Sequence, residues 1–327
     1  ERTVPMALRR SLTFRSARLA LCGTRHGWPA ELLGARHCTS GPELSQPLDI
    51  VYEDGDYFFV NKPYGVSVAP VPADDKSSYT SRLQAAAELS YGHRPTPVLG
   101  LPTQATGLVP FAKNYAAEQH LKKLWTAGEG SPLAGRLFHG FLALCTPLSS
   151  DSKALRFEKK KVLKKGLMKR RDRNRSMLVA KGGDPVRLSL QIAWQGHLNP
   201  RDVGIVARDG EDKETMEFLM MHMRPLTRLK DQLRAACCFL NAPVVGDTKY
   251  RGHRHERVFL HSSFISFASR MGHKAYEVRL APSWNNSALE DAASSYLGEL
   301  RAPLHSANTL LPSFARNPRS ALLPNVE

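Results

Sequence analysis

The sequence predicts a globular domain that contains both strands and helices. About 42% of the 327 residues are hydrophobic, which is enough for a buried core. Asp54-Gly55-Asp56 separates two apolar runs, and an Asp-Gly pair between such runs indicates a β-hairpin because glycine accepts a positive φ. Residues 115–127 carry apolar side chains at helical spacing, which predicts an amphipathic helix.

The same patterns assign the remaining elements in chain order. Strands are expected at residues 48–53, 57–61, 138–145, 177–179, 186–194, 204–208, 214–221, 257–267 and 276–281, and helices at 79–91 and 115–127. An acidic turn at 209–212 is expected to join the strand pair 204–208 and 214–221. Three parts follow: a basic extension with a linker (1–47), a domain at 48–300 with a basic insertion at 151–175, and a proline- and arginine-containing tail at 301–327.

The segment 98–114 carries the most specific motif in the chain. Its sequence, VLGLPTQATGLVPFAKN, resembles the catalytic loop of RluA-type pseudouridine synthases. Three further segments support this resemblance: Asn61-Lys62-Pro63 followed by a glycine-containing turn, the segment 227–250 that ends in Val-Gly-Asp-x-x-Tyr, and the Leu-His strand within 257–267. Four motifs in the family's order are a specific signal.

The resemblance implies an α+β fold with a central mixed, mostly antiparallel sheet flanked by helices. It also implies an RNA partner and no cofactor. In this alignment Gln232 and Arg234 match the glutamine and the second arginine of the family's helical motif, and Lys62 matches the lysine of its first motif. We therefore expect these three residues to contact RNA.

The catalytic groups that the resemblance calls for are missing. Pro102 stands at the nucleophilic aspartate and Gly100 at the basic residue that helps to displace the base. Phe141 replaces a tyrosine that packs against the base, and Leu229 replaces the arginine that pairs with the aspartate. No aspartate occurs between Asp75 and Asp151, so a shifted alignment does not restore the nucleophile. We expect no catalytic residue and an inactive site.

Positive charge is concentrated in two segments of a chain whose net charge is +16. Residues 151–175 contain twelve lysines and arginines against three acidic residues. Few apolar residues accompany them, so this segment is expected to be extended, or helical only when bound, and to contact RNA phosphates. The candidate RNA-binding residues are Lys159, Lys160, Lys161, Lys164, Lys165, Lys169, Arg170, Arg171, Arg173 and Arg175. A solvated loop and a nuclear-localisation signal are the alternatives.

The second basic segment lies near the N-terminus. Residues 6–30 contain five arginines, serine and leucine but no acidic residue, a composition typical of mitochondrial targeting peptides. An RNA-binding or disordered basic tail is the alternative. We expect a protein of the mitochondrial matrix.

Metal, disulfide and membrane roles are not expected. The five cysteines form no C-x-x-C pair, and His253, His255 and His261 have no cysteine or carboxylate that would complete a metal shell. No apolar run approaches the roughly 18 residues that span a bilayer.

These observations favour one function over two alternatives. The first is an inactive, pseudouridine synthase-like protein that binds ribosomal RNA, as a large-subunit assembly factor or ribosome-associated protein with mitochondrial ribosomal or assembly proteins as partners. The second is an active rRNA or tRNA pseudouridine synthase with a relocated carboxylate. The third is a protein-binding scaffold.

Overall fold

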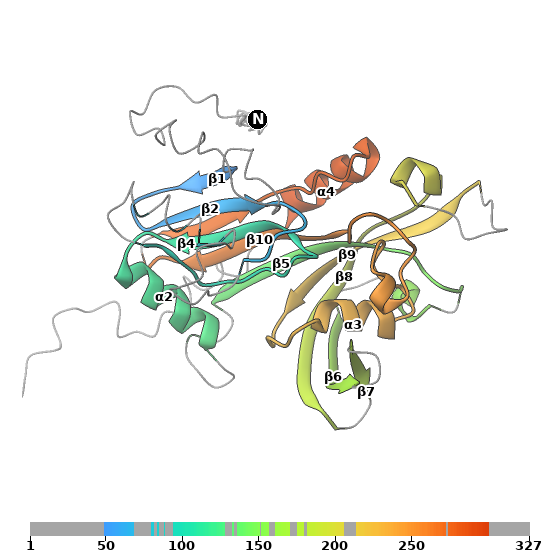
Figure 1. Ribbon diagram of the computed structural model, residues 1–327, viewed down its shortest axis with the longest axis horizontal. Helices are drawn as coiled ribbons and strands as arrows, with labels where there is room; N and C mark the ends of the chain where they lie inside the picture. The colour runs from blue at the N-terminus through green and yellow to red at the C-terminus, as the bar shows by residue number, and fades with distance from the viewer. Residues whose placement is uncertain are drawn as a thin grey trace, which may run out of the picture. The chain divides into compact units, whose positions relative to one another are not determined.

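An 11-stranded sheet organises the described part of the chain (Figure 1). The computed structural model describes residues 49–68, 80–81, 84, 88, 94–127, 133, 136–150, 152–156, 161–170, 175–179, 182–205, 214–272 and 274–300. Their main strand order is β1-β2-β4-β10-β5-β9-β8-β6-β7, with β11 paired to β10 and β3 to β4. All of these elements belong to one compact unit that begins at Leu48.

The strands are β1 (Ile50–Glu53), β2 (Tyr57–Lys62), β3 (Thr96–Pro97), β4 (Thr106–Ala112), β5 (Leu137–Cys145), β6 (Lys161–Arg170), β7 (Arg175–Val179), β8 (Asp184–Leu198), β9 (Met216–Pro225), β10 (Leu260–Ala268) and β11 (Ala275–Arg279). The α-helices are α2 (Tyr115–Thr126), α3 (Gln232–Phe239) and α4 (Ser287–Glu299), and the short 3₁₀ turns are η2 (Lys153–Arg156), η3 (Pro200–Val203) and η4 (Thr248–Tyr250). In Figure 1, α2 lies below β4, α4 lies above β10, and α3 lies beside β7.

The β1–β2 hairpin confirms the first sequence prediction. One carboxylate oxygen of Asp54 accepts hydrogen bonds of 2.9 Å from the backbone amides of Asp56 and Tyr57. These short-range hydrogen bonds close the turn. A Cβ atom added at Gly55 would meet no other atom within 4 Å. The hairpin is therefore specified locally by its turn residues.

The core is built on the central strands β4, β10 and β5. Every residue of β5 is buried, as expected for a strand that is covered on both faces. The β4–β10 pair is parallel, whereas the other described strand pairs are antiparallel. The expected α+β fold with a mixed, mostly antiparallel sheet is confirmed.

Helix α2 forms where the apolar spacing placed it. The Asn114 side chain accepts a hydrogen bond from the Ala117 amide, which caps the first turn. Leu121 and Leu124 then pack into a cluster with Tyr57 and Phe267. Residues 80, 81, 84 and 88 are helical, in agreement with the helix expected at 79–91, whereas α4 was not predicted.

Within the basic segment, residues 161–170 are extended, as expected, but they are ordered as part of the sheet. Residues 161–170 form β6, which pairs antiparallel with β7 on one side and with β8 on the other. Strand β8 pairs with residues 161–167 and β7 with residues 166–170, and the side chain of Leu167 is buried. Pairing with β7 and β8 therefore orders this segment, although it contains few apolar residues of its own.

The expected strand at 204–208 is also corrected. Gly204 ends the 3₁₀ turn η3 with φ +71°, and residues 206–213 lie outside the described part. The partners of β9 within the described chain are β8 and β5. The long strand β8, which extends the expected 186–194 at both ends, is one of these partners.

Candidate functional site

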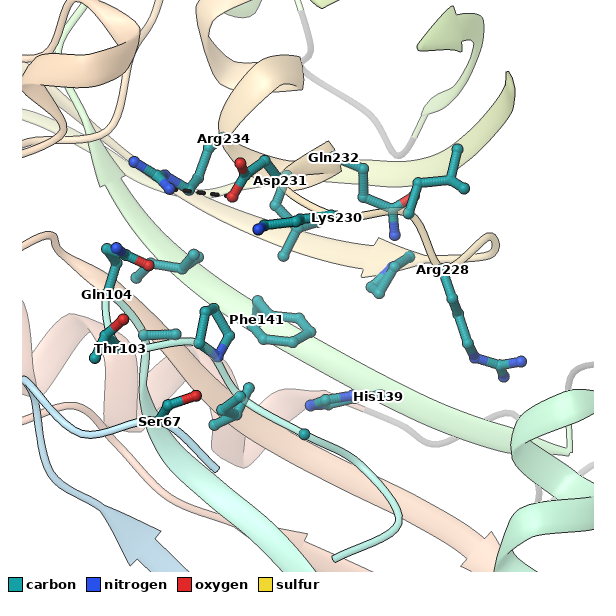
Figure 2. A pocket seen from close by; sticks show the side chains of 18 of the residues that line it. Ser67, Thr103, Gln104, His139, Phe141, Arg228, Lys230, Asp231, Gln232 and Arg234 are labelled. Atoms are coloured by element: carbon teal, nitrogen blue, oxygen red, sulfur yellow. Dashed lines mark hydrogen bonds and ion pairs between the residues drawn. The ribbon is translucent and has the colours of Figure 1, made fainter. Parts of the chain in front are cut away.

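A pocket of about 590 Å³ lies between the loop before β4, strand β5 and the start of α3. Figure 2 shows most of its side chains. Its lining consists of Ser67, Val68, residues 100–105, Trp125, His139, Phe141, Pro225, residues 228–234, Lys249 and Leu260. The pocket has the size of a small-molecule or nucleotide site. All four positions that sequence comparison had matched to catalytic groups, Gly100, Pro102, Phe141 and Leu229, line it.

The loop that carries Pro102 is held at both ends. Leu101 and Val68 exchange backbone hydrogen bonds of 2.8 and 2.9 Å, and the Ala105 amide donates to the Pro102 carbonyl. Downstream, Gly107 has φ +103°, and a Cβ there would lie 2.3 Å from the Ser262 carbonyl oxygen. Only glycine fits this position. The loop thus has a defined conformation, although Pro102 offers neither a nucleophile nor a backbone N–H.

Three rings form the aromatic side of the pocket. His139 and Phe141 share one face of β5 because strand side chains alternate, and their ring centroids are 4.3 Å apart. Trp125 reaches them from α2, with its ring centroid 6.1 Å from that of His139. Trp125 was predicted only as part of the apolar face of a helix, and its place in this pocket depends on how α2 packs.

Arg228 extends toward the aromatic side of the pocket, away from the charged start of α3 (Figure 2). Its guanidinium lies 3.8 Å from the centroid of the Trp125 ring, a stacked cation–π arrangement. Burial lowers the Arg228 pKa to about 10, so the side chain remains positively charged at neutral pH. Leu229, the next residue, turns an aliphatic side chain to the pocket.

The opposite side of the pocket is charged and centres on Asp231. This residue precedes α3 with φ +61°, a left-handed conformation that is costly for a residue with a Cβ, and its side chain does not cap the helix. Its carboxylate contacts Arg234 Nη1 at 3.1 Å and Lys249 Nζ at 3.6 Å. Asp231 is the one carboxylate among the pocket residues of the described chain.

Arg234 is fixed by a second aspartate. Its Nε and Nη2 donate to the two carboxylate oxygens of Asp247, each at 2.6 Å. Both side chains are almost fully buried, and Asp247 keeps the Arg234 pKa above its usual range. This bidentate pair anchors the start of α3 to the loop before η4. Sequence comparison matched Arg234 and Asp247 to one motif but did not reveal that they form a pair.

Two of the three residues that the resemblance led us to expect at the RNA are therefore bonded within the protein. Arg234 lines the pocket with its guanidinium held by two aspartates. Gln232 also lines the pocket and is bonded to Thr227, whose hydroxyl donates to Gln232 Oε1 at 3.0 Å.

Lys62 is not placed where it could contact RNA. Its side chain is fully buried, and its ammonium group donates to the carbonyl oxygens of Pro63 and Val66 at 2.8 and 2.6 Å. Burial lowers its pKa to about 7. We correct the expectation and assign Lys62 the role of holding the turn after β2.

The basic residues of β6 are partly exposed. Lys161 and Lys164 face solvent, Lys165 lies 5.5 Å above the Phe239 ring, and Arg175 begins β7. Arg175 Nη1 donates to the Lys249 carbonyl at 3.4 Å, so the β6–β7 pair adjoins the charged side of the pocket. Lys159, Lys160, Arg171 and Arg173 lie outside the described residues, as do the side chains of Lys169 and Arg170.

The histidines noted in the sequence have structural partners. His261 contacts the Thr106 hydroxyl at 2.8 Å and the Leu280 carbonyl at 3.2 Å, while His255 bonds to Arg257. No group of three or more histidine, cysteine, aspartate or glutamate side chains in the described ranges could hold a metal ion. Within the same ranges, no helix is long and apolar enough to cross a membrane.

Comparison with known proteins gives matches at the level of structure. No protein-family model and no curated protein matches the sequence. The chain is similar to human RNA pseudouridylate synthase domain containing 1, with TM-score 0.55 and 19% identity over 81% of this chain and 100% of that chain. It is also similar to human RNA pseudouridylate synthase domain containing 4, with TM-score 0.51 and 16% identity over 76% of this chain and 92% of that one. The chain therefore has the pseudouridine synthase fold.

Proposed function

We propose that this protein is a catalytically inactive, pseudouridine synthase-like protein that binds RNA. The observation that carries the proposal is the composition of the pocket. Its loop and strands have defined positions, yet Pro102 stands where the resemblance places the nucleophile, and Leu229 stands where it places the arginine partner. Loss of a covalent nucleophile can cost on the order of a million-fold in rate. RNA binding, in contrast, does not need the nucleophile and depends on the fold and its positively charged side chains.

The positively charged groups favour RNA as the ligand. Lys230 and Lys249 line the pocket, Arg175 lies beside Lys249, and the exposed Lys164 lies farther along β6. A backbone with regularly spaced phosphates can contact several of these groups at once. The described surface therefore favours a nucleic acid over a small anionic ligand.

The finer proposal concerns the RNA and the compartment. We propose ribosomal RNA as the ligand, mitochondria as the location, and a role as a large-subunit assembly factor or ribosome-associated protein. Support comes from the composition of residues 6–30 and from the RNA-modifying proteins that share the fold. Fusion of residues 1–47 to a fluorescent protein tests the location: the fusion should enter mitochondria, and a cytosolic signal would contradict this part.

A mapping experiment tests the lack of catalysis. Pseudouridines in mitochondrial RNA are compared between normal cells and cells that lack the protein, and purified protein is incubated with the same RNA. We expect identical pseudouridine maps and measurable RNA binding whose logarithmic affinity falls with logarithmic salt at a slope of about −4 if six phosphates of single-stranded RNA are contacted. A site that disappears on deletion and is formed by the purified protein would overturn the proposal.

One observation favours an active enzyme as the second candidate. Asp231 places a carboxylate in the pocket, held by Arg234 and Lys249, and the family chemistry needs a carboxylate that an arginine keeps ionised. If the mapping experiment detects catalysis, Asp231→Asn should abolish it while preserving the shape of the side chain. Glu299→Gln, a change on α4, is the matched control and should leave it intact.

A further inference from the structure

Two lysines from separate segments lie over the same aromatic ring at the end of α3. Lys153 Nζ lies 4.6 Å from the centroid of the Phe239 ring, and Lys165 Nζ lies 5.5 Å from the same centroid. Phe239 is the last residue of α3 and is half-buried. None of these three residues lines the pocket. Positively charged groups therefore also gather outside the site described above.

The backbone around both lysines is held in place. The Ser152 hydroxyl donates to the Leu240 carbonyl oxygen at 2.9 Å, and the Ala154 amide donates to the same oxygen at 3.3 Å. These bonds attach the turn η2, which begins at Lys153, to the chain just after α3. Lys165 lies in the part of β6 that pairs with β8. The folded structure thus brings the ring and the two ammonium groups together.

Two arginines extend this cluster toward the pocket. Burial raises the pKa of the Cys238 thiol, and the positive charges of Arg251 and Arg175 oppose the increase, so both guanidinium groups lie near the residue before Phe239. Arg175 Nη1 also donates to the carbonyl oxygen of Lys249, a residue that lines the pocket. A run of positively charged groups therefore leads from the pocket to the ring.

These cations lack carboxylate partners. Among the described residues, no ion pair joins Lys153, Lys165, Arg175 or Arg251 to an aspartate or a glutamate. The Nε of Arg175 is in addition buried without a hydrogen-bond partner. Two ammonium groups that share one ring repel each other, and the ring offsets only part of this repulsion. An anion bound between them would lower the repulsion further.

We propose that the surface formed by Lys153, Lys165, Phe239, Arg175 and Arg251 binds the phosphates of a single-stranded RNA whose neighbouring nucleotides lie at the pocket. The eight residues of α3 span about 12 Å, a distance that a single strand covers in a few nucleotides. Positive side chains around an aromatic ring are typical of surfaces that bind single strands. This inference rests on the proposed RNA binding and assigns RNA contacts outside the pocket.

The salt dependence of RNA binding tests this surface. A short, fluorescent, single-stranded RNA is titrated with the full-length protein at several salt concentrations, and anisotropy gives the affinity. Lys153→Gln combined with Lys165→Gln should make the slope of logarithmic affinity against logarithmic salt shallower by about 1.4, because each phosphate contact contributes about 0.7 with a single strand. Lys153→Arg combined with Lys165→Arg keeps both charges and should keep the parent slope.

A matched control removes the same charge elsewhere. Lys123→Gln combined with Arg270→Gln changes exposed positions on α2 and in the β10–β11 turn, and the parent slope should persist. An equal change of slope in this control and in the double lysine-to-glutamine variant would overturn the inference, because the effect would then come from the net charge of the protein. The slope does not depend on the fraction of protein that is folded, so a partly folded variant still gives a result.

Substitution of the ring tests its role in positioning the two ammonium groups. Phe239→Leu keeps an apolar side chain but removes the aromatic face, and it should weaken RNA binding about threefold at fixed salt. Phe239→Tyr keeps the ring and should bind RNA like the parent protein. Affinities are compared after correction for the active fraction, which a stoichiometric titration measures. Equal affinities of the leucine and tyrosine variants would contradict the role of the ring.

Failure of the inference and failure of the proposed function give different results. A parent-like slope in the double lysine-to-glutamine variant would overturn the inference and leave RNA binding at the pocket intact. The surface would then serve another anionic ligand, such as an acidic protein segment. Failure of the parent protein to bind RNA would instead overturn the proposed function on which the inference rests.

Discussion

The pocket and strand β6 hold charge in different ways. At the pocket, the buried Arg234 is bonded to the buried Asp247 and to the partly buried Asp231. On β6, Lys164 extends into solvent from the stretch, residues 161–167, that pairs with β8. The difference teaches that the charges of Arg234, Asp231 and Asp247 maintain structure, whereas the exposed Lys164 faces solvent, where a partner can reach it. Loss of one side chain should therefore affect folding in the pocket and binding at β6.

The sharpest test of this comparison is the Arg234–Asp247 pair. Asp247→Ala leaves a buried guanidinium without its bidentate partner, and breaking such a pair costs about 3 to 5 kcal/mol. We expect the free energy of unfolding in urea to fall by that amount. Asp231→Ala is the matched control and should cost less, because Asp231 makes the longer contact to Arg234. Equal effects of the two changes would contradict the dominant role of Asp247.

The buried histidines His139 and His261 predict that the protein loses stability as the pH falls. Burial lowers the pKa of His139 and of His261 to about 3, whereas an unfolded histidine titrates near 6.5. Between these values the unfolded chain binds more protons, so stability is lost as pH falls below about 6.5. Each histidine should remove about 2 kcal/mol between pH 7 and pH 5.

Urea unfolding at these two pH values measures the histidine effect. A His139→Gln variant should lose less stability on acidification than the parent protein. His120→Gln is the control, because His120 is only partly buried on α2. An equal pH dependence in parent and His139→Gln protein would show that His139 is not buried in the neutral form.

The buried Lys62 predicts a change in the free energy of unfolding of similar size at alkaline pH. Its pKa is about 7 in the fold and about 10.4 in an unfolded chain, so the unfolded chain binds more protons between these values. Stability should therefore rise by about 2 kcal/mol from pH 7 to pH 9. Lys62→Met should abolish the rise, and Lys123→Met, at an exposed position on α2, should preserve it. Persistence of the rise in Lys62→Met would assign it to another group.

The smallest effect on stability is expected on β6. Lys164→Gln should change the free energy of unfolding by no more than about 0.5 kcal/mol. The slope of RNA affinity against salt should become shallower by about 0.7, the contribution of one phosphate contact with single strands. Arg254→Gln removes the same charge from an exposed position outside β6 and should leave the slope unchanged. A large loss of stability in the β6 variant would contradict the comparison.

Local rules explain which elements could be predicted. The β1–β2 turn is closed within four residues by Asp54, and α2 is marked by its Asn114 cap and its apolar spacing. The four motif positions in the pocket could be found because their neighbours match a family pattern. Trp125 and Arg228 could not, because residues far apart in the sequence meet there.

The sequence by itself determined the hairpin, α2, the central strands and the presence of Pro102 where a nucleophile is needed, since each depends on neighbouring residues or on the identity of one side chain. Only the tertiary structure decided that the basic segment is ordered as β6, that Lys62 is buried, that Arg234 pairs with Asp247, and that His139 has one unpaired nitrogen. The physical reason is that strand pairing, desolvation and hydrogen-bond satisfaction depend on groups brought together by folding.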